Sequence, residues 1–275
     1  MDKYYLYSFK NIYDFQKFLE KETSPLFKQK AYLASSTGSE QFTGTESYNQ
    51  ATDFLNNGWS APVAKMASLM INKIMAPKQQ LKKSVVGSIP IVPAAIKGHP
   101  LSMLQAKKIP QKTSSINIVY NMTGNCNIDA DTLINSGLCI LNLAQALENN
   151  HISTQLNVMP KFSICKNEIV ACFVNIKNYS QPFNLKKIAY PLAHASFFRR
   201  HGFKFLEVCK DLKNTSWTRG YGVSFPGPST ELHPHEKTAL EKLHLDKNSV
   251  YIKIQDCIKA NFDWKQLAKN KGLSI

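Results

Sequence analysis

The sequence predicts an α/β protein with a mixed, mainly parallel sheet and flanking helices, placed after a helical N-terminal region. The first observation is that residues 116–158 have the pattern strand, turn, long helix, strand. The second is a hydrophobic content of 43% with 11% aromatic residues, which is typical of a folded globular chain. The third is the length of 275 residues, enough for one large domain or two small ones. We therefore divide the chain into a helical region at 1–80 and an α/β domain at 81–275.

The N-terminal region contains one short candidate strand and several candidate helices. Residues 1–10 alternate tyrosine with apolar residues, which indicates a strand. Asn11 stands before an apolar helical repeat, and Thr45 or Ser47 stands before the next, where a polar side chain caps the first turn. Gly58 is placed to end the second of these helices. Residues 61–76 form a methionine-rich amphipathic pattern, which we interpret as a helix packed in the core rather than a partner-binding groove.

The central stretch contains the clearest pattern in the chain. Ile116 to Tyr120 are mostly apolar, as expected for a strand buried on both faces. Asp129 and Asp131 stand in the first turn of a helical repeat that continues to Glu148, and carboxylates are favourable at the positive end of a helix. Residues 152–158 indicate the next strand. A strand, a crossover helix and a strand in one sheet predict parallel pairing with right-handed connection.

The segments after the central stretch continue the α/β pattern. Residues 169–177 indicate a third strand, and residues 162–165 are placed to pair with it as a hairpin. Asn184 can cap a helix, which Pro191 must bend or restart because proline lacks the backbone N–H. Residues 249–254 indicate a final strand.

The turn after residue 120 carries a first family resemblance. Asn121, Thr123 and Asn125 occupy the positions of an Asp-x-Ser-x-Ser metal loop at the end of a first strand. On that ground the central unit resembles the opening of a von Willebrand factor A-like domain, and a Rossmann-like layer with a polar turn is the alternative. Of the carboxylate and two hydroxyls of that loop, only one hydroxyl remains here, that of Thr123. Hard cations prefer carboxylate oxygens, and the carboxylate is missing. We therefore predict no bound metal there, and no cofactor.

A second resemblance extends over more of the chain. Residues 42–59, 85–100, the central unit and 191–203 recur in this order in an uncharacterised protein family of tailed bacteriophages, which the sequence resembles. The resemblance implies a viral setting but no mechanism.

The charge is the strongest feature of the composition. The chain has 34 basic and 19 acidic residues, a net charge of +15 and a pI near 9.5. A basic balance of this size favours polyanionic partners. We expect nucleic acid, DNA or RNA, as the partner, and a protein partner is the alternative. Only three of the basic residues are arginine, and the abundance of lysine, asparagine and isoleucine is also what an AT-rich genome would produce.

The segment 187–205 combines aromatic and cationic side chains on a single helical face. Single-stranded nucleic acid is held by such mixtures, because bases stack on rings and phosphates contact cations. A long loop at 211–231 adds two more residues of these types. The predicted nucleic-acid-binding residues are Lys187, Tyr190, His194, Phe197, Phe198, Arg199, Arg200, His201, Lys204, Trp217 and Arg219. The alternative is a helix packed on both sides with its basic end in water.

The sequence contains no local motif of catalysis, metal binding or membrane insertion. It has no phosphate-binding P-loop, nucleophile elbow, Ser/Cys-His-Asp arrangement or paired CxxC spacing. We therefore assign no catalytic residues, while an active site assembled from distant residues stays open. The six cysteines are expected to be free, buried thiols. No apolar run is long enough for a membrane span, and no signal peptide is evident. The location expected is the host-cell cytoplasm, with the virion as the alternative.

Two functions follow from these patterns. The first is a non-catalytic basic viral protein that binds nucleic acid as an accessory in transcription, replication or packaging. The second is a protein-interaction scaffold that uses the degenerate von Willebrand A-like site, as a virion component.

Overall fold

The structure is a computed structural model that describes residues 3–24, 31–33, 39–61, 79–108, 114–124, 128–165, 168–210, 238, 241 and 248–273. Its backbone contacts divide the chain into two compact units. The main unit is Met1–Ile71 together with Ser115–Ile275, and the small unit is Asn72–Ser114. The sequence placed the boundary at residue 80. In the structure the first strand of the N-terminal region belongs to the sheet of the main unit.

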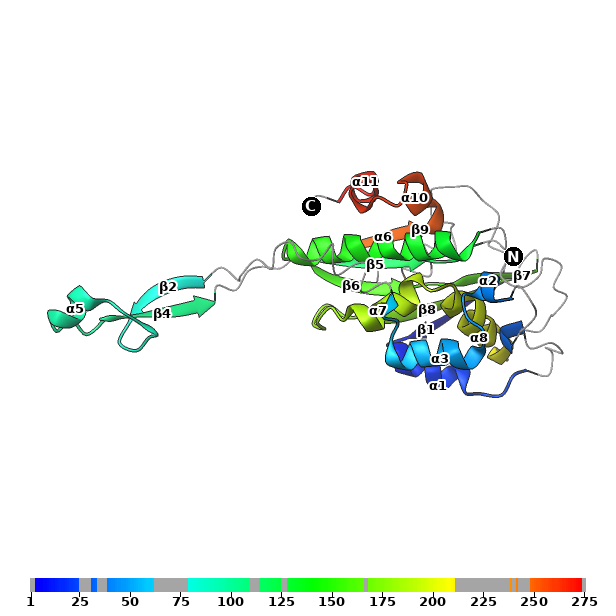
Figure 1. Ribbon diagram of the computed structural model, residues 1–275, viewed down its shortest axis with the longest axis horizontal. Helices are drawn as coiled ribbons and strands as arrows, with labels where there is room; N and C mark the ends of the chain where they lie inside the picture. Colours follow the sequence, from blue (N-terminus) through cyan, green and yellow to red (C-terminus); the bar gives the residue numbers. More distant parts are fainter. Residues whose placement is uncertain are drawn as a thin grey trace. The chain divides into compact units, whose positions relative to one another are not determined.

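The main unit contains a six-stranded sheet in the order β1-β8-β6-β5-β9, with β7 paired to β8 (Figure 1). Its strands are β1 (Lys3–Phe9), β5 (Ser115–Asn121), β6 (Ser153–Val158), β7 (Lys161–Cys165), β8 (Glu168–Lys177) and β9 (Ser249–Lys253). Three pairings are parallel, β1 with β8, β5 with β6 and β5 with β9. The pairings of β8 with β6 and with β7 are antiparallel. The predicted class, a mixed and mainly parallel sheet with flanking helices, is confirmed.

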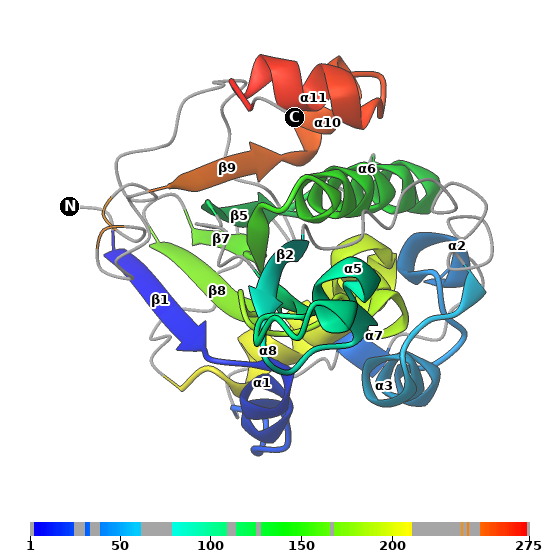
Figure 2. The same cartoon turned by 90° about the vertical axis from the view of Figure 1, so that its left-hand side faces the viewer.

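Three helices of the main unit begin at capping residues that the sequence indicated, Asn11, Ser47 and Asn184, and the helix Ala130–Asn149 begins after Asp129, which the sequence placed in its first turn. Side-chain oxygens of Asn11, Ser47, Asp129 and Asn184 each accept a hydrogen bond from a backbone N–H in the first turn. Figure 2 shows α6, α7 and α3 on the same side of the sheet. The helical segments are α1 (Ile12–Leu19), η1 (Ala31–Leu33), α2 (Ser39–Thr43), α3 (Tyr48–Asn57), α6 (Ala130–Asn149), α7 (Leu185–Ala193), η2 (Phe197–Gly202), α8 (Phe203–Val208), α10 (Ile254–Lys259) and α11 (Trp264–Asn270).

The predicted strand–helix–strand unit is present as β5, α6 and β6. β5 and β6 pair in parallel from Ser115 opposite Ser153 to Tyr120 opposite Val158. Alternate residues of each strand face the helices, because successive side chains of a strand point to opposite faces. They join one large apolar core with side chains of α1, α6, α7, η2 and α8. The helix-covered face of the sheet therefore holds most of the hydrophobic core.

The opposite face of the sheet carries a ladder of polar side chains across four strands. Asn117 of β5 donates to Ser249 of β9 at 2.9 Å and accepts from Asn157 of β6 at 2.5 Å. Asn157 in turn accepts from Asn175 of β8 at 2.8 Å. The three asparagines are buried. Such a ladder satisfies buried amides only in one strand register, which favours this pairing over a slipped one.

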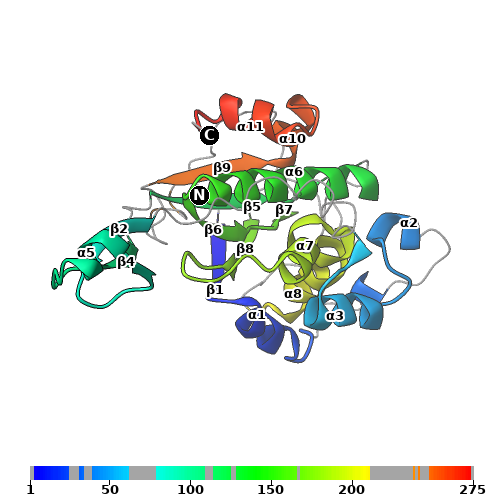
Figure 3. The same ribbon diagram turned by 60° about the vertical axis from the view of Figure 1, so that its left-hand side comes forward.

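The small unit is a three-stranded antiparallel sheet with one short helix. Its order is β2-β4-β3, and Figure 3 shows α5 beside β2 and β4. Its elements are β2 (Gln79–Ser84), β3 (Ile89–Pro90), α5 (Val92–Ile96) and β4 (Met103–Lys108). Between residues 81 and 105 no residue is buried. The methionine-rich segment predicted as a helix at 61–76 lies, apart from Ala61, outside the described residues.

Candidate nucleic-acid interface

The segment predicted to bind nucleic acid begins in α7 and continues through η2 into α8. Pro191 lies inside α7, which ends two residues later at Ala193, and His194 is extended with φ −86° and ψ 129°. The chain then restarts as the π-helical turn η2 and continues as α8. The predicted effect of Pro191 is thus observed, since proline removes a helical donor and limits the length of the helix.

Most side chains of the predicted interface lie in the core. Lys187 is exposed and Lys204 is half-buried, whereas Trp217 and Arg219 lie outside the described residues. The buried members are Tyr190, His194, Phe197, Phe198, Arg199, Arg200 and His201. Side chains that water does not reach cannot stack on bases or contact phosphates in this conformation. The structure corrects the predicted surface, because both faces of the segment are covered by packed elements.

The two arginines hold separate segments of the chain together through backbone carbonyls. The guanidinium of Arg200 donates to the carbonyls of Tyr32 at 2.9 Å and Thr45 at 2.7 Å, and to the Thr45 hydroxyl at 2.6 Å. Arg199 donates to the carbonyls of Phe42 at 2.6 Å and Ile128 at 2.5 Å. A planar guanidinium with five donors suits such convergent acceptors. These contacts give both arginines a structural role.

A polar network lies beside them. The hydroxyl of Tyr190 is 2.9 Å from the Ser196 hydroxyl and 3.1 Å from His201 Nδ1, and the Ser196 hydroxyl is 2.8 Å from His194 Nδ1. Burial lowers the pKa of His194 to about 4 and that of His201 to about 3. Both imidazoles are therefore neutral at pH 7.

The direction of the hydrogen bonds in this network follows from one fixed donor. The backbone N–H of Ser196 donates to His194 Nδ1 at 3.2 Å, so that nitrogen is an acceptor. The Ser196 hydroxyl then donates to it, the Tyr190 hydroxyl donates to Ser196, and His201 Nδ1 donates to Tyr190. His201 Nε2 remains as a bare acceptor, and it has no hydrogen-bond partner among the described residues.

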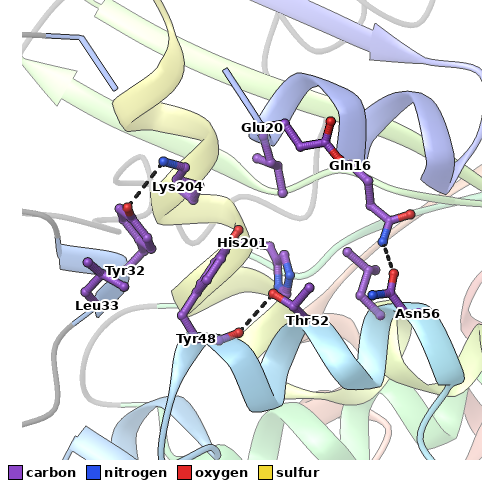
Figure 4. Close-up of a pocket in the computed structure, with 11 residues that line it drawn as sticks. Gln16, Glu20, Tyr32, Leu33, Tyr48, Thr52, Asn56, His201 and Lys204 are labelled. Carbon is purple, nitrogen blue, oxygen red and sulfur yellow. Dashed lines mark hydrogen bonds between the residues drawn. The ribbon is translucent and has the colours of Figure 1, made fainter. Parts of the chain in front are cut away.

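His201 also lines a pocket of about 410 Å³ (Figure 4). Lys204, the other predicted residue at this site, donates from Nζ to the Tyr32 hydroxyl at 3.3 Å and lies over the Tyr32 ring. Tyr48 is tilted against the ring of His201 with centroids 5.2 Å apart. The lining residues are Gln16, Leu19, Glu20, Tyr32, Leu33, Tyr48, Thr52, Leu55, Asn56, His201 and Lys204. The pocket is a concave site of ligand size. Its one cationic side chain, that of Lys204, already donates to the Tyr32 hydroxyl.

The degenerate metal-loop positions are used for local structure. Asn121 accepts from the backbone N–H of Thr123 at 3.0 Å and donates to the Tyr251 hydroxyl at 2.8 Å. The Thr123 hydroxyl accepts from the backbone N–H of Lys161 at 2.7 Å. Asn125 lies outside the described residues. Within the described ranges, no three His, Cys, Asp or Glu side chains are grouped closely enough to hold a metal ion.

The strongest concentration of positive charge is in the small unit, which the sequence reasoning missed as a site. Residues 54–128 contain no aspartate or glutamate. Asn72–Ser114 therefore carries a formal charge of +8, more than half of the net +15 of the chain. Its lysines are Lys73, Lys78, Lys82, Lys83, Lys97, Lys107, Lys108 and Lys112. The position of the acidic residues along the sequence would have indicated this region, because none lies within it. The total charge of the chain does not show where the positive charge is concentrated.

The fold and its surfaces define an α/β protein with a mixed sheet and a separate basic β-sheet unit. A family model described as a domain of unknown function (DUF7192) matches residues 2–269, so the chain belongs to that family. No curated protein and no solved structure matches the chain. Among the helices that the structure describes, none combines the length and apolar character of a membrane span.

Proposed function

We propose that this protein binds nucleic acid without catalysing a reaction, and that its main contact is the small unit Asn72–Ser114. The observation that carries the proposal is the charge of +8 on this unit without a single carboxylate. Lys82, Lys83 and Lys97 are exposed. Lysines on a surface without acidic neighbours release condensed counterions when they contact phosphates, and this release drives non-specific binding.

The setting belongs to the same proposal. The sequence resemblance supports a bacteriophage setting, in the host-cell cytoplasm or in the virion, and within that setting we propose an accessory role in transcription, replication or packaging. The antiparallel pairing of β8 with β6, next to the parallel pair β5 and β6, supports the von Willebrand A-like order of the core. In this proposal the core is a scaffold, and the small unit makes the contact.

Binding is tested with the full-length protein and three labelled probes of about 20 nucleotides or base pairs, which are duplex DNA, single-stranded DNA and duplex RNA. Fluorescence anisotropy at about 50 and 200 mM salt should give saturable binding that weakens steeply at the higher salt. Absence of saturable binding to all three probes at the lower salt would refute the function.

A protein partner is the second candidate, and exposed apolar side chains favour it. Val85, Val86 and Ile96 of the small unit are 64%, 74% and 81% exposed. Apolar side chains gathered on a surface are a common feature of protein interfaces. The scaffold function predicted from the sequence placed the partner at the degenerate von Willebrand A-like site instead. If a protein partner binds the small unit, Val86→Ser with Ile96→Ser should abolish that complex, while the salt-dependent binding described above should be absent from the unmodified protein.

A further inference from the structure

We infer that the β2–β4 ribbon enters the major groove of duplex DNA and directs Lys82 and Gln105 at the base edges. This inference rests on the proposed function and specifies the type of nucleic acid and the contacting side chains. All the residues that carry the inference belong to the small unit, and the structure describes both strands of the ribbon.

The first support is shape. β2 and β4 pair antiparallel from Gln79 opposite Lys108 to Ser84 opposite Met103, which makes a ribbon about 20 Å long. β3 adds a third strand at Leu104 and Met103, so Lys82 and Gln105 lie in the two-stranded part. The major groove of B-form DNA admits a two-stranded ribbon of this kind. The major groove of A-form RNA is deep and narrow, so side chains cannot reach its bases. The ribbon therefore suits duplex DNA.

The second support is the difference between the two faces of the ribbon. Lys82 is directly opposite Gln105, and directly opposite residues of paired strands lie on the same face. Ser84 lies on that face as well. Lys83 is opposite Leu104 and shares the other face with Leu81 and with Ile89 of β3. Of the side chains described, the first face thus holds Lys82, Gln105 and Ser84 with one apolar residue, Met103, and the other holds Leu81, Leu104 and Ile89 with one lysine, Lys83.

The third support is chemical. Lysine donates to O6 and N7 of guanine, and glutamine pairs with N6 and N7 of adenine. Lys82 and Gln105 are both exposed, and they stand side by side across the ribbon as two such groups. Leu81, Leu104 and Ile89 offer no hydrogen-bonding groups, so on the other face Lys83 alone of these residues could donate to a base edge. A second copy of the chain is a poor occupant of this surface, because it would bring another +8 against the first.

The neighbouring lysines provide a matched pair of variants. Lys82→Ala and Lys83→Ala remove the same charge from adjacent exposed positions on opposite faces of β2. Lys82→Ala should weaken duplex DNA binding about tenfold, and Lys83→Ala by about twofold or less. Lys82→Arg should retain most of the affinity, since arginine makes the same contact to guanine. Selection from a random duplex library should yield an adenine preference at one position that Gln105→Ala abolishes.

The outcomes separate this inference from the proposed function. Duplex DNA should bind at least about tenfold more tightly than duplex RNA or single-stranded DNA. If all three bind equally, or if Lys82→Ala and Lys83→Ala lose the same affinity, the groove inference is wrong and the function stands. A greater loss for Leu81→Gln than for Lys82→Ala would also overturn it, because the apolar face would then make the contact. If the unmodified protein binds none of the probes, the function itself fails.

Discussion

Arg200 donates hydrogen bonds to both oxygens of Thr45, at 2.6 Å to the hydroxyl and 2.7 Å to the carbonyl, although 155 residues separate them in the sequence. Arg200 is fully buried. The contact fixes the loop before α3 against the π-helical turn. A residue that the sequence suggested for phosphate binding is in this way part of the packing of the main unit.

We expect Arg200→Ala to lower the free energy of unfolding by about 3–5 kcal/mol, because it leaves the Tyr32 and Thr45 carbonyls without their charged donor. Arg200→Lys should recover only part of the loss, since an ammonium cannot reproduce the planar fork. Chemical denaturation measures both. Lys187→Ala, at an exposed position of α7, is the control and should be close to neutral. A loss below about 1 kcal/mol for Arg200→Ala would contradict the structural role.

Gly137→Ala tests the close approach of α6 and α7. A Cβ at Gly137 would lie 2.3 Å from Ala193 Cα and 2.4 Å from the Leu192 carbonyl oxygen, and backbone atoms cannot move aside as a flexible side chain can. We expect a loss of about 3 kcal/mol or more in the free energy of unfolding. Asn135→Ala, on the exposed side of the same helix, should be neutral or slightly stabilising. Similar melting temperatures for the two variants would show that the helices are not packed this closely.

The two buried histidines predict how stability depends on pH. Their folded-state pKa values of about 4 and about 3 lie below the value of 6.5 for unfolded histidine. Below pH 6.5 the unfolded state therefore binds more protons than the folded state, and stability falls as the pH falls. Between pH 7 and pH 5 each histidine should account for a loss of about 2 kcal/mol in the free energy of unfolding.

Urea denaturation at both pH values measures this loss. His201→Gln should reduce the pH dependence by about half, whatever its effect on stability at pH 7. His99→Gln, at an exposed position of the small unit, is the control for the histidine-to-glutamine change itself. Equal pH dependence of the unmodified protein and His201→Gln would mean that His201 is not held neutral.

The local patterns of the sequence predicted much of the fold. Asn11, Ser47, Asp129 and Asn184 start helices, and the parallel pair around α6 forms as expected, because capping and hydrophobic periodicity act over a few residues. The cysteines at 139, 172 and 257 are free and buried, as expected, and Cys209 is buried as well.

The candidate site could not be predicted in the same way. A helical projection shows that Tyr190, His194 and Phe197 share a face, but it cannot show that α3 and α1 cover this face. Burial of a cationic segment depends on distant acceptors such as the Thr45 and Phe42 carbonyls. The basic small unit was visible in the sequence as a small basic edge at Lys107, Lys108 and Lys112, interpreted as a solvated loop, and as the stretch between Asp53 and Asp129 without acidic residues.

The most direct test of the proposed function is the salt dependence of duplex DNA binding in two matched triple variants. The first changes Lys82, Lys83 and Lys97 of the small unit to glutamine. The second changes three exposed lysines of the main unit, Lys187, Lys259 and Lys269, to glutamine. Both variants remove the same charge, so a difference between their salt slopes shows which unit contacts the DNA phosphates.

The logarithm of the binding constant, plotted against the logarithm of the salt concentration, has a slope of about −0.9 per phosphate contact. We expect the small-unit variant to make this slope shallower by about 1 to 3, while the main-unit variant keeps the slope of the unmodified protein. Equal slopes in the two variants, or a larger change in the main-unit variant, would contradict the assignment of the small unit as the nucleic-acid contact.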